Sequence, residues 1–254
     1  AVMRIIPRLN EEVNEEWISD KTRFIWDGLG RQRLDRPYIR KDGKLTPASW
    51  DEALTLAAEH LKKPAEKVAA VTGDLADVEA TKATLDLMRS LGVQNTDCRQ
   101  DGAKIGTDAN GERMSRESYL FNSSIMGLDE ADALLIIGAN PRTEAPVLNA
   151  RIRKQWLHRD MTVAMIGEQV DLTYPYDYVG AGASSLAELK PGNATFDWLK
   201  NAKRPMIIVG QGALQRGDGA AILKAARDLA DKHCVKDGWN GFGVLHTAAA
   251  RVGG

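Results

Sequence analysis

The stretch from Ala133 to Lys154 constrains the fold more than any other part of this sequence. It contains an unbroken apolar run, Leu134 to Ile137, which is typical of a strand buried on both faces of a parallel sheet. Gly138 then permits a tight turn, and Pro141 excludes a continuing central strand. From Glu144 to Trp156 apolar residues recur at helical spacing. A strand, a short turn and a helix in this order form the crevice in which open α/β sheets bind ligands.

The rest of the sequence alternates in the same way between short apolar runs and amphipathic stretches. We expect further strands at 67–73, 93–96, 161–166 and 205–210, and helices at 49–62, 78–91, 144–157 and 218–233. This alternation predicts an α/β fold with crossover units and a parallel sheet. The glycine-rich and polar stretches 98–114 and 167–196 are predicted to be loops.

The first 45 residues form a polar, arginine-rich lead-in with little periodicity. Within it, Asp42-Gly43 stands between two short extended runs and predicts a hairpin over 35–45. Ser49 is suited to cap the helix that follows, because Glu52 stands three residues on, in the position of a capping box.

The composition excludes several classes of function. A net charge of −1 over 254 residues gives no general attraction to nucleic acid or anionic lipid. No apolar run approaches the roughly 18 residues of a membrane span, so we expect no direct membrane insertion. The opening residues 1–10 are too short and too charged for a signal peptide. The sequence starts and stops without a natural boundary, and we interpret it as a segment of a longer polypeptide.

Motifs that carry chemistry are weak, and we assign no catalytic residue. Gly210 to Gln215 resembles a dinucleotide fingerprint, but Gln215 stands where the third glycine belongs, which favours a plain strand-to-helix turn. A Gly-x-x-x-x-Gly-Lys phosphate loop and a Gly-x-Ser-x-Gly elbow are both missing. The four histidines lie far apart and predict no zinc site: His60, His158, His233 and His246.

The two cysteines, Cys98 and Cys234, cannot hold an iron–sulfur cluster alone, because a cluster needs about four thiolate ligands. Their small number fits a reducing compartment. Cys98 lies beside Arg99, which favours a thiolate, but a lone loop cysteine is more often inert.

One basic and aromatic cluster is a candidate for a protein interface. Arg151, Arg153 and Trp156 fall on one predicted helix, and arginine with tryptophan is the combination that interface centres favour. Nearby acidic residues balance the charge, so a solvated face or a contact with another subunit is favoured over nucleic acid.

Long phrases of the sequence resemble the large iron–sulfur subunit of respiratory complex I, the 75-kDa or NuoG type. The matching phrases cover 2–24, 27–29, 32–34, 49–54, 138–153, 171–174 and 213–223. The later part of that subunit resembles the molybdopterin oxidoreductases. The resemblance therefore implies two regions: 1–45, the tail of an iron–sulfur-type region with the hairpin, and 46–254, a molybdopterin-oxidoreductase-like α/β region that is truncated at its C-terminus.

The sequence departs from the wider molybdopterin pattern where that pattern binds its cofactors. Ser19 stands where the wider family has its last cluster cysteine. The turn at Gly138, Asn140 and Pro141 survives, and we interpret it as a vestigial cofactor turn. The family's Asp-Pro-Arg phrase, which helps to hold the pterin nucleotide, is replaced by residues 166–173.

The resemblance implies a scaffold segment of NADH-quinone oxidoreductase that is itself cofactor-free and not catalytic. The 2Fe-2S and 4Fe-4S clusters of the parent subunit would lie in a region N-terminal to this sequence. Expected partners are other peripheral-arm subunits, including the flavin- and NADH-binding subunit. The expected location is peripheral, on the cytoplasmic side of the bacterial inner membrane or the matrix side in mitochondria.

Two alternatives remain open at this point. The turn from Gly138 to Pro141 is compatible with an active molybdopterin oxidoreductase fragment of the formate dehydrogenase kind. The turn from Gly210 to Gln215 is compatible with a generic nucleotide-binding module.

Overall fold

The computed structural model describes residues 2–254 and divides them into two compact units. Among these residues, the first unit comprises 2–6, 20–98 and 253–254, and the second comprises 7–19 and 99–252. The regions 1–45 and 46–254 therefore do not coincide with the two units, and that division stays a prediction.

The first unit is small and carries few buried side chains. Its helices are α1 (Asp20–Phe24), α2 (Trp50–Leu61) and α3 (Val78–Ser90), with 3₁₀ turns at Trp26–Gly30 and Ala65–Lys67. Its strands are β1 (Tyr38–Lys41), β2 (Lys44–Pro47), β3 (Ala70–Val71) and β4 (Thr96–Asp97). Its buried core consists of Val68, Met88 and Val93.

Two predictions in this unit are confirmed. Strands β1 and β2 pair as an antiparallel hairpin, and Asp42 and Gly43 turn with φ of 50° and 78°, as a two-residue hairpin requires. Ser49 caps α2: its hydroxyl accepts from the Glu52 backbone N–H, and the Glu52 carboxylate accepts from the Ser49 N–H.

The second unit is built on a five-stranded sheet in the order β11-β8-β5-β6-β7, in which every pair is parallel. The strands are β5 (Ala133–Ile137), β6 (Thr162–Ile166), β7 (Asp177–Gly180), β8 (Pro205–Val209) and β11 (Phe242–Val244). A separate antiparallel pair is formed by β9 (Val235–Lys236) and β10 (Trp239–Asn240). The parallel sheet confirms the predicted α/β class.

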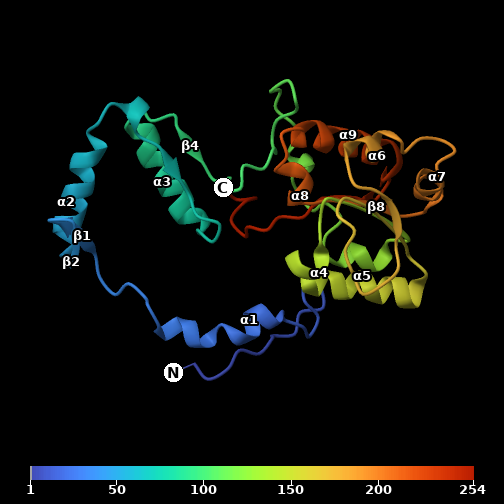
Figure 1. Cartoon of the computed structure of the whole chain (residues 1–254), viewed down its shortest axis with the longest axis horizontal. Helices are drawn as coiled ribbons and strands as arrows, with labels where there is room; N and C mark the ends of the chain where they lie inside the picture. Colours follow the sequence, from blue (N-terminus) through green and yellow to red (C-terminus); the bar gives the residue numbers. More distant parts are fainter. Residues whose placement is uncertain (1) are drawn as a thin grey trace. The chain divides into compact units, whose positions relative to one another are not determined.

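Helices cover both faces of this sheet (Figure 1). The helices are α4 (Pro141–Glu144), α5 (Pro146–Arg159), α6 (Ala183–Ala187), α7 (Ala194–Asn201), α8 (Gln211–Leu214) and α9 (Gly219–His233), with 3₁₀ turns at Arg116–Ser118 and Met126–Glu130. Alternate strand residues face the two sides. Leu134 and Ile136 pack with α5, whereas Leu135 and Ile137 pack with α6, α7 and α9.

Strand β5 is the centre of the core, because all five of its residues are buried and it is hydrogen-bonded on both edges. Leu135 stands opposite Ala164 of β6 and Ile207 of β8. A side chain buried in this way contributes about 1.5–3 kcal/mol. The continuous apolar run therefore reflects burial on both faces of the sheet, as predicted.

Some predicted elements are wrong in extent. The strand expected at 67–73 is reduced to Ala70–Val71, and the one expected at 93–96 lies at Thr96–Asp97. The stretch 167–196 contains β7, α6 and the start of α7 as well as loop. Strand β7 pairs only with β6 and is largely exposed, so it lacks the apolar run that marks the inner strands.

Candidate functional site

The topology of the sheet defines where a ligand is expected. From β5 the chain proceeds to β6 and β7 on one side, then returns to β8 and β11 on the other. The order of strands therefore reverses between β5 and β8. In open α/β sheets ligands bind outside the carboxyl ends of the strands at such a switch point. The predicted cofactor turn, which begins at Gly138, lies at this place.

Two backbone turns approach each other closely at this switch point. Gly138 has φ of 61°, and a Cβ there would lie 2.5 Å from the backbone nitrogen of Ala213. A Cβ on Gly210 would overlap the Cβ of Ala139, and one on Gly212 would lie 2.8 Å from the carbonyl oxygen of Gly138. The turns after β5 and β8 therefore touch at distances that only glycine allows.

The second glycine turn thus has a packing role. Gly210 donates its N–H to the Ile137 carbonyl at 2.8 Å and precedes the one-turn helix α8. The Gln211 amide donates to the Leu245 carbonyl at 2.9 Å. This arrangement agrees with the interpretation of Gly210 to Gln215 as a strand-to-helix turn.

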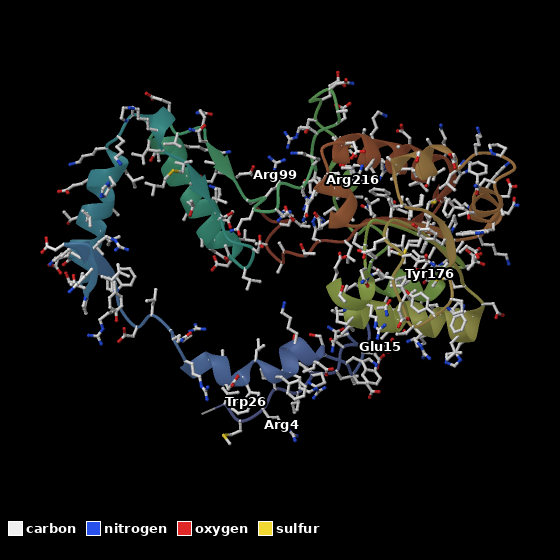
Figure 2. All side chains as sticks on the ribbon, in the orientation of Figure 1. Arg4, Glu15, Trp26, Arg99, Tyr176 and Arg216 are labelled. Carbon is white, nitrogen blue, oxygen red and sulfur yellow. The ribbon has the colours of Figure 1, made fainter. Side chains whose placement is uncertain are left out.

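A cavity of about 250 Å³ lies beside this contact, at the carboxyl ends of β5 and β6. Its polar lining includes Asn140, Glu144, Glu168 and Arg216, and the rest is mainly apolar or glycine. The Glu144 carboxylate accepts the Asn140 backbone N–H at 2.7 Å and so holds the turn closed. Figure 2 shows Arg216 near the start of the last long helix, α9.

The cation of this cavity is already paired. The Arg216 guanidinium donates twice to the Asp218 carboxylate, at 2.7 and 3.0 Å. The hydrogen bond to Arg216 is the main reason why the pKa of Asp218 is lowered, and the same pairing raises the pKa of Arg216. The two glutamates therefore dominate the charge that the cavity offers to a ligand.

The predicted interface residues separate into two places on α5. Arg153 and Trp156 lie toward residues 173 and 174: Arg153 donates to the Thr173 carbonyl at 3.3 Å, and Trp156 stacks on Tyr174 with the ring centres 6.5 Å apart. Arg151 is buried elsewhere on the helix and pairs with Asp129. Contact of these residues with another subunit stays a prediction.

A buried polar pair beneath this helix escaped the sequence analysis. The Tyr174 hydroxyl donates to the Asn149 side chain at 2.8 Å, and the Asn149 amide donates to the Leu172 carbonyl at 3.1 Å. Burial raises the pKa of Tyr174, with a smaller contribution from Tyr176, so the phenol is neutral. The pair ties the loop after β6 to α5, and the tyrosine-rich phrase 174–178 was its only signal in the sequence.

The remaining histidine and cysteine side chains of the described residues do not gather at one site. Within residues 2–254 no three of the histidine, cysteine, aspartate and glutamate side chains are arranged to hold a metal ion. Cys234 is fully buried, and burial raises the pKa of its thiol to about 12. His246 contacts the Tyr119 carbonyl at 2.7 Å, and burial lowers its pKa. In the same described range, no helix has the length and apolarity needed to cross a bilayer.

Comparison with known sequences identifies the class of protein. Residues 33–254 match the profile of the family described as molybdopterin oxidoreductase. The chain belongs to this family, since the match covers most of the sequence. Residues 1–27 match a second profile, the 4Fe-4S domain of NADH-ubiquinone oxidoreductase NDSU1/NuoG-like proteins.

Individual relatives are more specific. The chain is 47% identical to the NADH-quinone oxidoreductase G subunit of Rickettsia bellii, over 100% of this chain and 37% of that protein. It is 44% identical to the mitochondrial 78 kDa subunit of NADH-ubiquinone oxidoreductase of Neurospora crassa, over 99% of this chain and 34% of that protein. The chain thus spans about a third of these relatives, and the resemblance to the large iron–sulfur subunit is confirmed.

Solved structures give a weaker likeness. A chain of the formyltransferase/hydrolase complex of Methylorubrum extorquens, solved with methylofuran, superimposes with a TM-score of 0.49 at 18% identity. The superposition covers 82% of this chain and 60% of that chain.

The family name implies a pterin cofactor, and the residues of this chain do not fit one. Sites for drug-sized ligands have volumes of about 300–1,000 Å³, and the cavity beside the turns is smaller. A pterin nucleotide is anionic and needs cations or N–H donors. The cavity presents Glu144 and Glu168, and its arginine is held by Asp218. The contact between the turns at Gly138 and Gly210 leaves no space between them for a ligand.

Proposed function

We propose that this chain is a cofactor-free scaffold segment of the large iron–sulfur subunit of NADH-quinone oxidoreductase. In this role it supports a relay of electrons from NADH to quinone and is not itself catalytic. The observations that carry the proposal are the close contact between the turns at Gly138 and Gly210 and the acidic lining of the small cavity beside it, at the ligand position of the sheet. A large packed α/β body can be kept as a scaffold without its original chemistry.

The partners of this scaffold are the other peripheral-arm subunits of complex I, including the flavin- and NADH-binding subunit. Its place is peripheral, on the cytoplasmic face of the bacterial inner membrane or the matrix face in mitochondria. The iron–sulfur clusters belong to the cysteine-bearing region N-terminal to these residues, since 1–27 contain no cysteine and match the 4Fe-4S domain profile. We further propose Arg153 and Trp156 as contacts with a neighbouring subunit.

Cofactor analysis of the purified protein tests the proposal against its alternative, an active molybdopterin oxidoreductase fragment. The family match is the observation that favours the alternative. Acid extraction and oxidation convert a bound pterin into a fluorescent product. We expect no such fluorescence and no stoichiometric molybdenum or iron. Recovery of either the pterin or molybdenum at one equivalent per chain refutes the scaffold role.

Assembly of the complex tests the interface contacts. Alanine at Trp156 or Arg153 should reduce the amount of assembled complex, while the activity per assembled complex stays unchanged. The matched control is Arg159→Ala, at the exposed end of the same helix. Normal assembly in both interface variants contradicts the contact.

A further inference from the structure

A buried arginine joins the N-terminal residues to the α/β body. The side chain of Arg151 is only 3% exposed. Its Nη1 donates to the Asp129 carboxylate, and its Nη2 donates to the backbone carbonyl of Glu11 at 2.8 Å. The Glu15 carboxylate lies 3.5 Å from Nη2. The Arg151 guanidinium thus contacts two groups of the N-terminal residues, the Glu11 carbonyl and the Glu15 carboxylate. It contacts one group of the α/β body, the Asp129 carboxylate.

Two more side chains of α5 complete this network. The Lys154 ammonium donates to the same Glu15 oxygen that faces Arg151. The Gln155 amide donates to the second oxygen of Asp129 at 2.9 Å. Two cations and two carboxylates therefore balance one another, and Figure 2 shows Glu15 beside α5.

The N-terminal residues at this contact are ordered by their own hydrogen bonds. We call residues 7–19, which belong to the same compact unit as α5, the N-terminal strap. Within it the Asn14 amide donates to the carbonyls of Arg8, Glu15 and Trp17 at 3.0–3.1 Å. Glu15 has φ of 51°, a backbone conformation that is uncommon for a glutamate and is kept only where the surroundings enforce it.

Apolar packing contributes only in part to holding the strap in place, through Trp17, which lines a pocket with Val147 and Leu157 of α5. Leu9, Val13 and Trp17 are 66%, 48% and 53% exposed. Since these large side chains of the strap face solvent to this extent, the polar contacts with Arg151 and Lys154 are its main attachment.

We propose that the Arg151 network is the mount that fixes the strap, as part of the 4Fe-4S domain match, on the α/β body. This inference rests on the proposed function, because the strap lies within residues 1–27, which match the 4Fe-4S domain profile. Buried ion pairs contribute little net stability, but their strict geometry can specify one arrangement over others. Arg151 acts as a positioning residue that holds the strap in one place against α5.

Two measurements on the full chain test the mount. The first is hydrogen exchange of the strap amides that donate to Asn10, those of Val13, Asn14 and Glu15. We expect Arg151→Gln to raise their exchange rates at least 10-fold and to leave the amides of the central strand β5 unchanged. The matched control is Arg159→Gln, which removes an exposed charge at the end of the same helix.

The second measurement is the distance distribution between two spin labels. One label is placed at Glu12→Cys in the strap and the other at Asp228→Cys in α9, in a background with Cys98→Ser and Cys234→Ala. With Arg151 in place we expect a narrow distribution of label distances. Arg151→Gln should broaden this distribution, and Arg151→Lys should give an intermediate width. Lysine keeps the charge for Asp129 but cannot reach three partners at once.

Two outcomes overturn the mount: strap exchange in Arg151→Gln equal to that in Arg159→Gln, or an unchanged distance distribution. If Arg151→Gln does not fold, Glu15→Gln takes its place, since it leaves the Asp129 pair intact. Glu15→Gln must still raise strap exchange at least 10-fold, and no change overturns the mount. A bound pterin would refute the scaffold role and leave these readouts unaffected, so the two failures are distinguishable.

Discussion

Gly138→Ala measures how closely the two turns at the switch point approach each other. An alanine there meets two costs. Its backbone must keep φ of 61°, which costs an L-residue about 1–2 kcal/mol. Its Cβ also enters a space 2.5 Å from the nitrogen and 2.6 Å from the Cβ of Ala213, and overpacking of this kind costs about 1–3 kcal/mol. We expect a total loss of about 2–5 kcal/mol.

Gly102→Ala is the matched control. Gly102 has φ of 71°, and a Cβ there would have nothing within 4 Å. It therefore carries the backbone cost and the entropic effect on the unfolded chain, but not the overpacking. Urea unfolding followed by near-ultraviolet circular dichroism gives the free energy of each variant. The difference between Gly138→Ala and Gly102→Ala isolates the contact with Ala213.

A double-mutant cycle adds a second check. Ala213→Gly removes the atom at 2.6 Å but keeps the backbone nitrogen at 2.5 Å, so it should rescue Gly138→Ala in part. We expect a coupling of about 0.5–3 kcal/mol, the range for residues in contact. If Gly138→Ala costs no more than Gly102→Ala and the cycle is additive, the turns are apart and the crevice between them is open to a ligand.

Three further predictions concern local features of the chain. Burial lowers the pKa of His246, so it resists protonation in the folded state; unfolding should become easier as the pH falls below 6.5 toward that lowered pKa, and full stability should return above 6.5. His246→Gln should flatten this slope by at most about 1.36 kcal/mol per pH unit in a pH series of urea melts; an unchanged slope means that other groups cause it. Iodoacetamide at pH 8 should modify Cys98 well before Cys234, whose buried thiol has a pKa raised to about 12, and peptide mass spectrometry finding the reverse order contradicts the burial. Ser49→Ala should destabilise α2 by about 1 kcal/mol, measured as faster hydrogen exchange in its first turn, and equal exchange rates would mean that the capping box contributes nothing.

The sequence predicted the elements whose causes are local. The run from Leu134 to Ile137 marked the inner strand, Pro141 marked the turn, and Ser49 marked a helix start. Strands β7 and β11 were not predicted, because they are the two short strands at the edges of the parallel sheet. Edge strands need no long apolar run, so periodicity carries little information about them.

The sequence predicted where the candidate site lies, but not that its two turns are in close contact. Gly138, Asn140 and Pro141 lie at the switch point of the sheet, as the strand–turn–helix pattern indicated. The close approach of the two turns depends on Gly210, a tertiary neighbour that no local pattern identifies. For the same reason the sequence predicted Arg151 to lie on a solvated face or at an interface. Its partner Glu15 lies far away along the sequence, so local patterns could not show its burial.

The meeting of the turns after β5 and β8 also limits protein engineering. Trimming side chains enlarges a pocket whose walls are side chains. Here main-chain atoms of residues 138 and 213 stand in the way, and glycine already occupies the tightest positions. A designer who wished to place a nucleotide between these turns would have to rebuild two loops together, because the closest approaches involve main-chain atoms of both.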